Sequence, residues 1–174
     1  MMPRILTPDL RVHRVEEIDP VLLGRLRIES LLLDIDCTLK PYRDPHVPIG
    51  ILDWIGTLRR AGVGLCLVSN GRDARVEPVA RRLGLPFVAT AMKPFPYGCR
   101  TAMARLGFDR QRTAMVGDQV FADVMAGRLA GVFTILVDPI CPEQEPWYTR
   151  LKRPLERLYV RGVVHEPTCR VDSE

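Results

Sequence analysis

Two aspartates two residues apart follow directly on an apolar run near the start of the chain. The run is Leu31 to Leu33, and the acidic pair is Asp34 and Asp36. An aliphatic run that stops at acidic residues is typical of a buried parallel strand ending at the sheet edge where α/β folds bind ligands. Two neighbouring carboxylates repel each other, and a divalent cation relieves that repulsion. Because Mg²⁺ prefers oxygen ligands and commonly joins carboxylates to a substrate phosphate, the pair indicates a metal-assisted phosphoryl site.

Polar groups also stand at the ends of three later apolar runs. They are Ser69 and Asn70, then Lys93, then Gly117 and Asp118, with Asp123 one helical turn beyond. The carboxyl ends of parallel strands meet at one edge of a sheet, so we expect these groups to converge on the first acidic pair. Each also has an ordinary interpretation, such as a turn at Ser69 or a helix cap at Asp118. Their common position at strand ends favours one shared site.

The order and context of these motifs resemble those of the haloacid dehalogenase superfamily of phosphatases. Within it, the chain resembles subfamily IIIA phosphatases of the YqeG type, which are related to mitochondrial and plastid phosphatidylglycerophosphate phosphatases. The resemblance covers roughly residues 6 to 160 and includes the segments Leu6-Thr7-Pro8-Asp9, Ile18-Asp19-Pro20, Asp123-Val124 and Thr134-Ile135-Leu136-Val137. Two positions depart from it. Cys37 stands where Asn is usual, and Arg128-Leu129 stands where Asn-Arg is expected.

This resemblance implies a role for each candidate residue. Asp34 is the expected nucleophile, which forms an aspartyl phosphate, and Asp36 the acid and base that serves the leaving group and then water. The expected metal is Mg²⁺, held by Asp34, the backbone carbonyl of Asp36 and Asp118. The expected phosphate-binding residues are Ser69, Asn70 and Lys93, and the supporting residues are Thr38, Gly117 and Asp123. Asp123 is expected to orient Lys93 or a metal-bound water.

Alternating strand and helix patterns predict an α/β fold, a three-layer doubly wound sheet that is mostly parallel. The expected strands are residues 30–34, 63–68, 87–89, 113–116 and 132–137. The expected helices are residues 20–25, 49–61, 73–83, 96–106 and about 121–130. A proline-rich loop, residues 40–48, is expected to form a flap beside the site. The spacing between the motifs leaves no room for a cap domain, so the resemblance implies a capless enzyme with an open site.

The chain is expected to divide into a lead-in segment (residues 1–26), a catalytic core (27–140) and a basic amphipathic tail (141–174). In the tail, aromatic and leucine residues alternate with basic ones. Two interpretations of the tail stay open: a helix that packs on the core, or a segment that contacts an anionic membrane surface.

Composition limits the classes of protein. The chain has 174 residues, a net charge of +4 and 47% hydrophobic residues, which suit one globular domain. No apolar run approaches the ~18 residues that span a bilayer, and the N-terminus lacks the pattern of a secretory signal. The five cysteines are scattered without a Cys-x-x-Cys pair, which argues against a disulfide framework or zinc site. We therefore expect a cytoplasmic protein, and peripheral contact with the inner face of the membrane stays open.

The expected substrate is a phosphorylated small molecule or a lipid head group, with phosphatidylglycerophosphate as the leading candidate. A soluble phosphate ester and a non-catalytic binding protein of the same fold are the alternatives. A response-regulator receiver is excluded, because Ala89-Thr90 stands where its phosphorylated aspartate would be.

No nucleic-acid partner is expected, since no aromatic stacking platform is visible. Cys37 is not expected to be a nucleophile, because no histidine is placed to activate it. The oligomeric state is not predicted.

Overall fold

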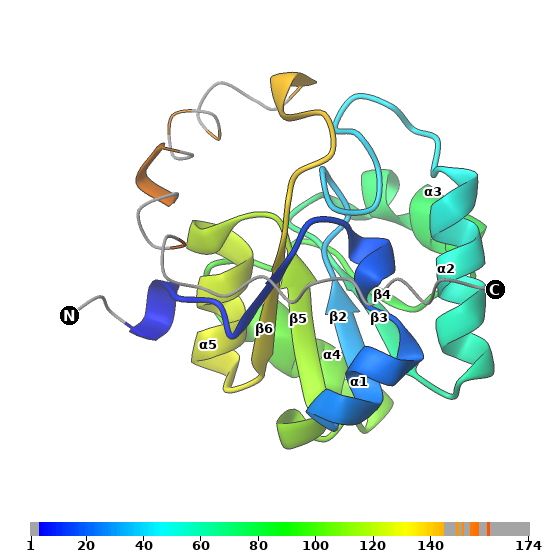
Figure 1. The fold of residues 1–174 in the computed structure, drawn as a ribbon. Helices are drawn as coiled ribbons and strands as arrows, with labels where there is room; N and C mark the ends of the chain where they lie inside the picture. Colours follow the sequence, from blue (N-terminus) through cyan, green and yellow to red (C-terminus); the bar gives the residue numbers. More distant parts are fainter. Residues whose placement is uncertain (1–3, 145–148, 150, 152–153, 157–159, 161–174) are drawn as a thin grey trace, which may run out of the picture.

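Six parallel strands form one sheet in the computed structural model of the protein, in the order β1-β6-β5-β2-β3-β4 (Figure 1). The structure describes residues 4–144, 149, 151, 154–156 and 160. The strands are β1 (Leu10–Val12), β2 (Ser30–Leu33), β3 (Gly64–Val68), β4 (Phe87–Val88), β5 (Thr113–Gly117) and β6 (Phe133–Val137). All neighbouring strands are parallel, so their carboxyl ends share one edge.

Helices alternate with the strands, as the sequence predicts. They are α1 (Pro20–Leu26), α2 (Ile49–Arg60), α3 (Asp73–Leu83), α4 (Tyr97–Leu106) and α5 (Met125–Ala130). The observed bounds of most elements lie within one residue of the predicted ones. The larger difference is at the expected helix of residues 121–130, which begins with a π-helical turn, Val120–Val124, before α5. Three of the helices end at a glycine with positive φ, at Gly84, Gly107 and Gly131, a common way to end a helix.

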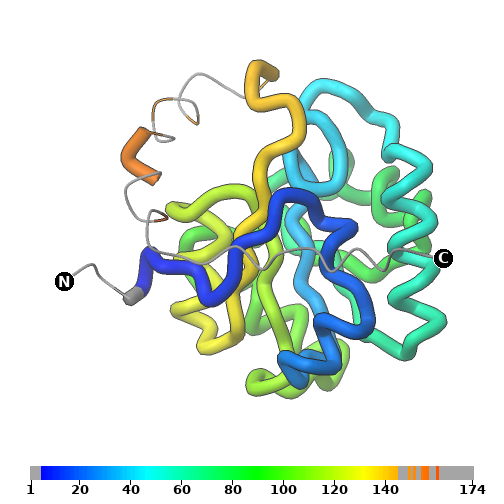
Figure 2. The backbone as a smooth tube through the Cα atoms, viewed as in Figure 1, coloured from blue at the N-terminus to red at the C-terminus, as the bar shows by residue number. Residues whose placement is uncertain are grey.

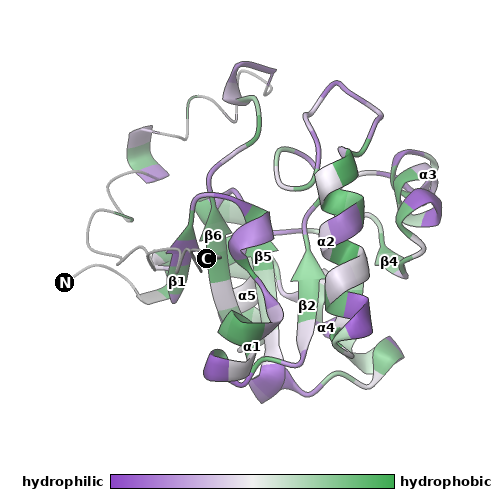
Figure 3. Cartoon of the chain, turned by 45° about the vertical axis from the view of Figure 1, so that its right-hand side comes forward, coloured by the Kyte–Doolittle hydropathy of each residue, from purple (hydrophilic) through white to green (hydrophobic). Residues whose placement is uncertain are grey.

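The two faces of the sheet bury separate apolar layers. On one face, Leu31 and Leu33 pack with side chains of α1, α2 and α3. On the other face, Leu32 and Met115 pack with side chains of α4 and α5. This alternation along β2 gives the three layers, and Figure 3 shows the apolar strands enclosed between more polar helices. Trp54 is core, as expected, and its indole N–H donates to the Ile18 carbonyl at 2.8 Å.

The segment before α1 contributes β1, which the sequence patterns do not predict. Asp9 precedes this strand, and its carboxylate accepts the Thr134 backbone N–H at 2.8 Å and pairs with Arg128 at 2.7 Å. The Arg128 guanidinium also donates to the Thr7 carbonyl. Arg128, one of the two departures from the family pattern, therefore ties the N-terminal segment to α5 and β6.

Nothing larger than one helix and one loop separates the motif-bearing strands. Residues 34–63 hold the loop and α2, and residues 69–86 hold α3, so the site has no cap in these intervals. The loop after β2 arches over the carboxyl edge of the sheet (Figure 2). In the described parts of the chain, no helix has the length and apolar content needed to cross a membrane.

Much of the tail lies outside the described residues, so both interpretations of the tail stay predictions. The predicted division of the chain at residues 26 and 140 also stays a prediction. Two contacts of the described part of the tail lie at the π-helical turn. Val160 packs with Val120, Val124 and Leu136. The Glu156 carboxylate accepts the Phe121 backbone N–H at 3.2 Å.

Candidate active site

The predicted site residues follow the carboxyl ends of the strands. Asp34 comes directly after β2, Ser69 after β3 and Asp118 after β5, while Lys93 lies between β4 and α4 and Asp123 lies in the π-helical turn. These five side chains are buried. The structure therefore places at one sheet edge the groups that the sequence spreads over ninety residues.

A lysine between carboxylates forms the centre of this group. The Lys93 ammonium donates to Asp34 at 2.5 Å and to Asp123 at 2.7 Å. The Thr38 hydroxyl lies 3.2 Å from an Asp34 oxygen and 3.3 Å from an Asp118 oxygen. Thr38 has one hydroxyl proton to donate, so it steadies one carboxylate at a time. The predicted orientation of Lys93 by Asp123 agrees with this geometry.

The Asn70 side chain fixes the backbone of Lys93 through two hydrogen bonds. Its side-chain amide donates to the Lys93 carbonyl at 2.9 Å, and its oxygen accepts the Lys93 backbone N–H at 2.8 Å. An amide nitrogen carries a second proton, so the predicted contact of Asn70 with phosphate stays a prediction. The Ser69 hydroxyl oxygen accepts the Gly71 backbone N–H at 3.1 Å, which leaves its own proton to donate toward the site.

Gly117 is required by the close approach of Asp123. A Cβ atom at Gly117 would lie 2.2 Å from the Asp123 carboxyl carbon, far inside contact distance. The Asp123 carboxylate also accepts the Gln119 backbone N–H at 3.1 Å. The supporting role predicted for Gly117 thus has a steric basis, because a side chain there would displace Asp123 from Lys93.

The acidic cluster fits a hard cation. Asp34, Asp118 and Asp123 offer carboxylate oxygens that all lie within 4.8 Å of one another. Oxygen ligands are those that Mg²⁺ and similar ions prefer. No hydrogen bond from the described residues reaches the backbone carbonyl of Asp36, so this predicted ligand is also available.

The charge balance of the cluster points the same way. Burial, with Asp123 adding to it and Lys93 opposing it, raises the pKa of Asp34 to about 7. Burial alone would lower the pKa of Lys93, but Asp123 and Asp34 outweigh it and raise the pKa above its ordinary value. A buried carboxylate with a raised pKa is short of positive charge, and a bound divalent cation supplies that charge.

Asp36 lies apart from the cluster and has basic partners of its own. One of its oxygens accepts from the Lys40 ammonium at 3.1 Å and from the Arg75 guanidinium at 3.0 Å. Arg75 also donates to the Tyr42 carbonyl at 3.2 Å and stacks over the Tyr42 ring at 4.4 Å. Sequence reasoning assigned no role in the site to Lys40, Tyr42 or Arg75. The four-residue spacing of Asp36 and Lys40 was a usable signal.

The backbone conformation at Cys37 explains why Asn is the usual residue at this position. Its φ is +64°, in the left-handed region that Asn tolerates better than most side chains. Two hydrogen bonds fix this turn: the Cys37 N–H donates to the Lys40 carbonyl at 2.8 Å, and the Cys37 carbonyl accepts the Ile140 N–H at 2.7 Å. The buried Cys37 side chain is thus part of a structural turn, and the turn aims Asp36 and Lys40.

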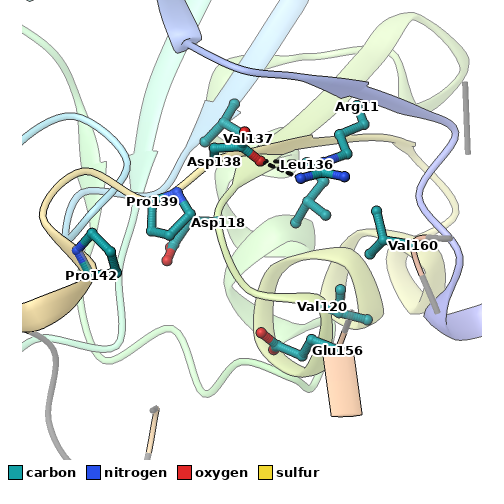
Figure 4. A pocket seen from close by; sticks show the side chains of 10 residues that line it. All are labelled: Arg11, Asp118, Val120, Leu136, Val137, Asp138, Pro139, Pro142, Glu156 and Val160. Atoms are coloured by element: carbon teal, nitrogen blue, oxygen red, sulfur yellow. Dashed lines mark hydrogen bonds and ion pairs between the residues drawn. The ribbon is translucent and has the colours of Figure 1, made fainter. Parts of the chain in front are cut away.

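A mainly apolar cavity of about 590 Å³ opens beside Asp118 (Figure 4). Its apolar lining comprises Val120, Leu136, Val137, Pro139, Pro142 and Val160. Arg11 and Asp138 also line the cavity and form an ion pair at 2.7 Å.

Metal and pH should act together on stability. Because the pKa of Asp34 is raised from 3.8 to about 7, its contribution to stability is present in acid and lost as the pH rises through about 7. Lys93 stays charged throughout this range. Without metal, we expect the melting temperature to fall by roughly 5–10 °C between pH 5 and pH 8. Added Mg²⁺ should raise it more at pH 8 than at pH 5.

Thermal unfolding with and without EDTA checks this, and the comparison needs two variants. Asp34→Asn should remove most of the pH dependence. Asp53→Asn, which changes an exposed aspartate in α2, should keep it. A Mg²⁺ effect that is equal at both pH values would contradict the predicted link between the metal and Asp34.

Comparison with known proteins assigns the class. Residues 23–131 match the family model of the haloacid dehalogenase-like hydrolases. The chain therefore belongs to this hydrolase family, as its motif order and its parallel sheet indicate.

Two relatives and one solved structure extend the comparison. The chain is 28% identical to "Probable phosphatase YqeG" of Bacillus subtilis, over 90% of this chain and 91% of that protein. It is 27% identical to "Phosphatidylglycerophosphate phosphatase 1, chloroplastic" of Chlamydomonas reinhardtii, over 91% of this chain but only 61% of that protein's length. The cobalt-bound deoxy-D-mannose-octulosonate 8-phosphate phosphatase of Haemophilus influenzae shares the fold, with a TM-score of 0.51 and 18% identity over 64% of this chain and 69% of that one.

Proposed function

We propose that the protein is a Mg²⁺-dependent phosphomonoester hydrolase that works through an aspartyl phosphate on Asp34. The observation that carries this proposal is the buried Asp34 carboxylate, which lies 2.5 Å from the Lys93 ammonium and within a three-aspartate cluster suited to a metal ion. Asp34, Asp118 and the Asp36 carbonyl would hold the ion, which neutralises charge on the substrate phosphate.

The proposed reaction has two chemical steps. An Asp34 oxygen attacks phosphorus, the bond to the leaving oxygen breaks, and Asp36 gives its proton to that oxygen. Water then attacks the phosphorus of the aspartyl phosphate while Asp36 takes up a proton, which releases inorganic phosphate and restores Asp34. Ser69 and Asn70 donate to phosphate oxygens, and Lys93 balances their charge.

Lys40 and Arg75 add a feature to this scheme. Both hold the same oxygen of Asp36, so they fix the direction of its carboxyl group and leave the second oxygen to face the leaving group. Lys40 is buried, whereas Arg75 is exposed. We assign both to positioning of Asp36 in this reaction.

The substrate class that we favour is a phosphorylated lipid, with phosphatidylglycerophosphate as the candidate. Similarity to the Chlamydomonas enzyme supports it. Two features of the site agree: no cap lies between the motif strands, and the cavity beside Asp118 is mainly apolar. Such a substrate implies peripheral contact with an anionic membrane. A soluble phosphate ester is the alternative, since the catalytic groups contact only the phosphoryl group.

Phosphate release separates these possibilities. The wild-type protein should release phosphate from phosphatidylglycerophosphate in mixed detergent micelles with Mg²⁺, and EDTA should stop the release. Turnover of an aryl phosphate without turnover of the lipid would keep the hydrolase and discard the lipid substrate. The absence of phosphate release from both substrates would favour a non-catalytic binding protein.

A further inference from the structure

Three large hydrophobic side chains close to the active-site lysine in the chain are exposed on the surface. Met92, Phe95 and Tyr97 are 56%, 62% and 58% exposed, whereas Lys93 is 8% exposed. Among the described residues, eight large hydrophobic side chains are exposed, and three of them lie in this six-residue segment. We call residues 92–97 the rim loop. Such clustering is unusual for a surface that meets only water.

The backbone holds these side chains outward. Asn70 bonds both the N–H and the carbonyl of Lys93, and the Phe95 N–H closes a turn on the Met92 carbonyl at 2.9 Å. Met92 has a φ of +58°, a costly conformation for a non-glycine residue. Since Lys93 must point into the site to reach Asp34 and Asp123, its neighbours in this turn face away from it.

Ala91 and Gly98, the residues that flank the rim loop, are in close contact. A Cβ atom at Gly98 would lie 2.4 Å from the Ala91 Cβ, and the Gly98 N–H donates to the Ala91 carbonyl at 3.1 Å. The backbone residues that flank the rim loop are therefore held close together. The exposed side chains of the loop form an apolar projection at the carboxyl edge of the sheet.

The position of this projection selects its partner. Lys93 belongs to the rim loop and contacts Asp34, so any body that covers Met92, Phe95 and Tyr97 lies beside the carboxyl edge of the sheet that carries the site. A protein seated there would hinder a substrate from reaching this edge, whereas a lipid surface would bring a lipid substrate to it. Aromatic side chains, and tyrosine in particular, favour the boundary between acyl chains and head groups.

Positive charge lies next to the rim loop. The Gly71 carbonyl accepts the Thr90 N–H at 2.8 Å, which joins the loop after β3 to the residues just before the rim loop. Arg72, the next residue, is exposed. A cation beside an apolar projection suits a surface of anionic lipid, as does the net charge of +4.

We propose that Met92, Phe95 and Tyr97 insert into the surface of an anionic bilayer and seat the active site over its phosphorylated lipid substrate. The proposal rests on the lipid phosphatase function above and adds the element that reaches the membrane. It differs from membrane contact through the C-terminal tail, because Met92, Phe95 and Tyr97 flank the active-site lysine in the chain and take no part in the chemistry themselves.

The test compares two double variants on vesicles. Phe95→Ser/Tyr97→Ser removes the aromatic part of the rim loop. Val21→Ser/Leu106→Ser is the matched control, since it removes apolar side chains that are 70% and 38% exposed on α1 and at the C-terminal end of α4. Binding is measured by flotation with phosphatidylglycerol and phosphatidylcholine vesicles. Turnover is measured on phosphatidylglycerophosphate in vesicles, on the same lipid in micelles, and on an aryl phosphate.

The rim-loop variant should bind phosphatidylglycerol vesicles about 10-fold or more weakly and should lose a similar factor of turnover on vesicles. Its aryl phosphate turnover and melting temperature should match those of the wild type, and the control variant should match it in every measurement. Unchanged vesicle binding by the rim-loop variant would overturn the proposal, whatever its turnover of the lipid substrate. A change from dimer to monomer without a change in vesicle binding would also overturn it and assign the loop to a second copy. A wild type that turns over only the aryl phosphate would instead remove the lipid substrate.

Discussion

The Asp34→Asn variant is expected to lose phosphatase turnover by a factor of about 10³ or more while remaining folded. An amide cannot attack phosphorus as a carboxylate does, so no other change in the site compensates for the loss. Burial disfavours the charged form of Asp34 and raises its pKa to about 7. A neutral side chain should therefore leave the metal-free protein at least as stable as the wild type at pH 8.

Steady-state phosphate release with saturating Mg²⁺ measures this loss, and circular dichroism verifies the fold. The Asp53→Asn variant serves as the control for an Asp-to-Asn change outside the site. Retention of more than a tenth of wild-type turnover by Asp34→Asn would mean that another group makes the bond to phosphorus.

The Lys93→Met variant is expected to lose both turnover and stability. Lys93 is buried between Asp34 and Asp123, with side-chain exposures of 3%, 10% and 3% respectively. Removing the ammonium leaves buried carboxylates without their cation, which typically costs about 3–5 kcal/mol. Methionine keeps most of the volume, so the loss reports charge more than packing. Turnover should fall as well, because the charge on the transferred phosphoryl group is no longer balanced.

Denaturant unfolding of metal-free protein measures the stability change. The double variant Lys93→Met/Asp123→Asn should recover part of it, since one of the unpaired carboxylates is then neutral. Lys40→Met, in the loop after β2, is the comparison: the Lys40 side chain is also buried, with 5% exposed, but its partner Asp36 is 21% exposed, so the cost should be smaller. Equal stability of Lys93→Met and wild type would show that the cluster is not charged as the geometry indicates.

The positions of the catalytic groups were predictable because strand ends in a parallel sheet share an edge. Asp34, Lys93 and Asp118 each follow a short apolar run, and that pattern alone places them together. β1 was not predictable in the same way. Leu10–Val12 offers only two apolar side chains around Arg11, and its place in the sheet depends on pairing with β6.

Contacts that depend on loop geometry also escaped sequence reasoning. The pairing of Arg75 with Asp36 joins residues 39 positions apart, and the clamp of Asn70 on Lys93 joins residues 23 positions apart. The π-helical turn that carries Asp123 has the composition of an ordinary helix, and its register is set by packing against Gly117. Such features follow from tertiary structure rather than from periodicity.

The covalent intermediate can be detected by acid quenching of the wild-type protein during turnover, followed by peptide mass spectrometry. We expect a phosphoryl group on the peptide that contains Asp34, assigned to Asp34 by fragmentation and absent from the Asp34→Asn variant. A phosphoryl group on another residue, or steady phosphate release with no phosphorylated peptide at any quench time, would contradict the aspartyl-phosphate mechanism.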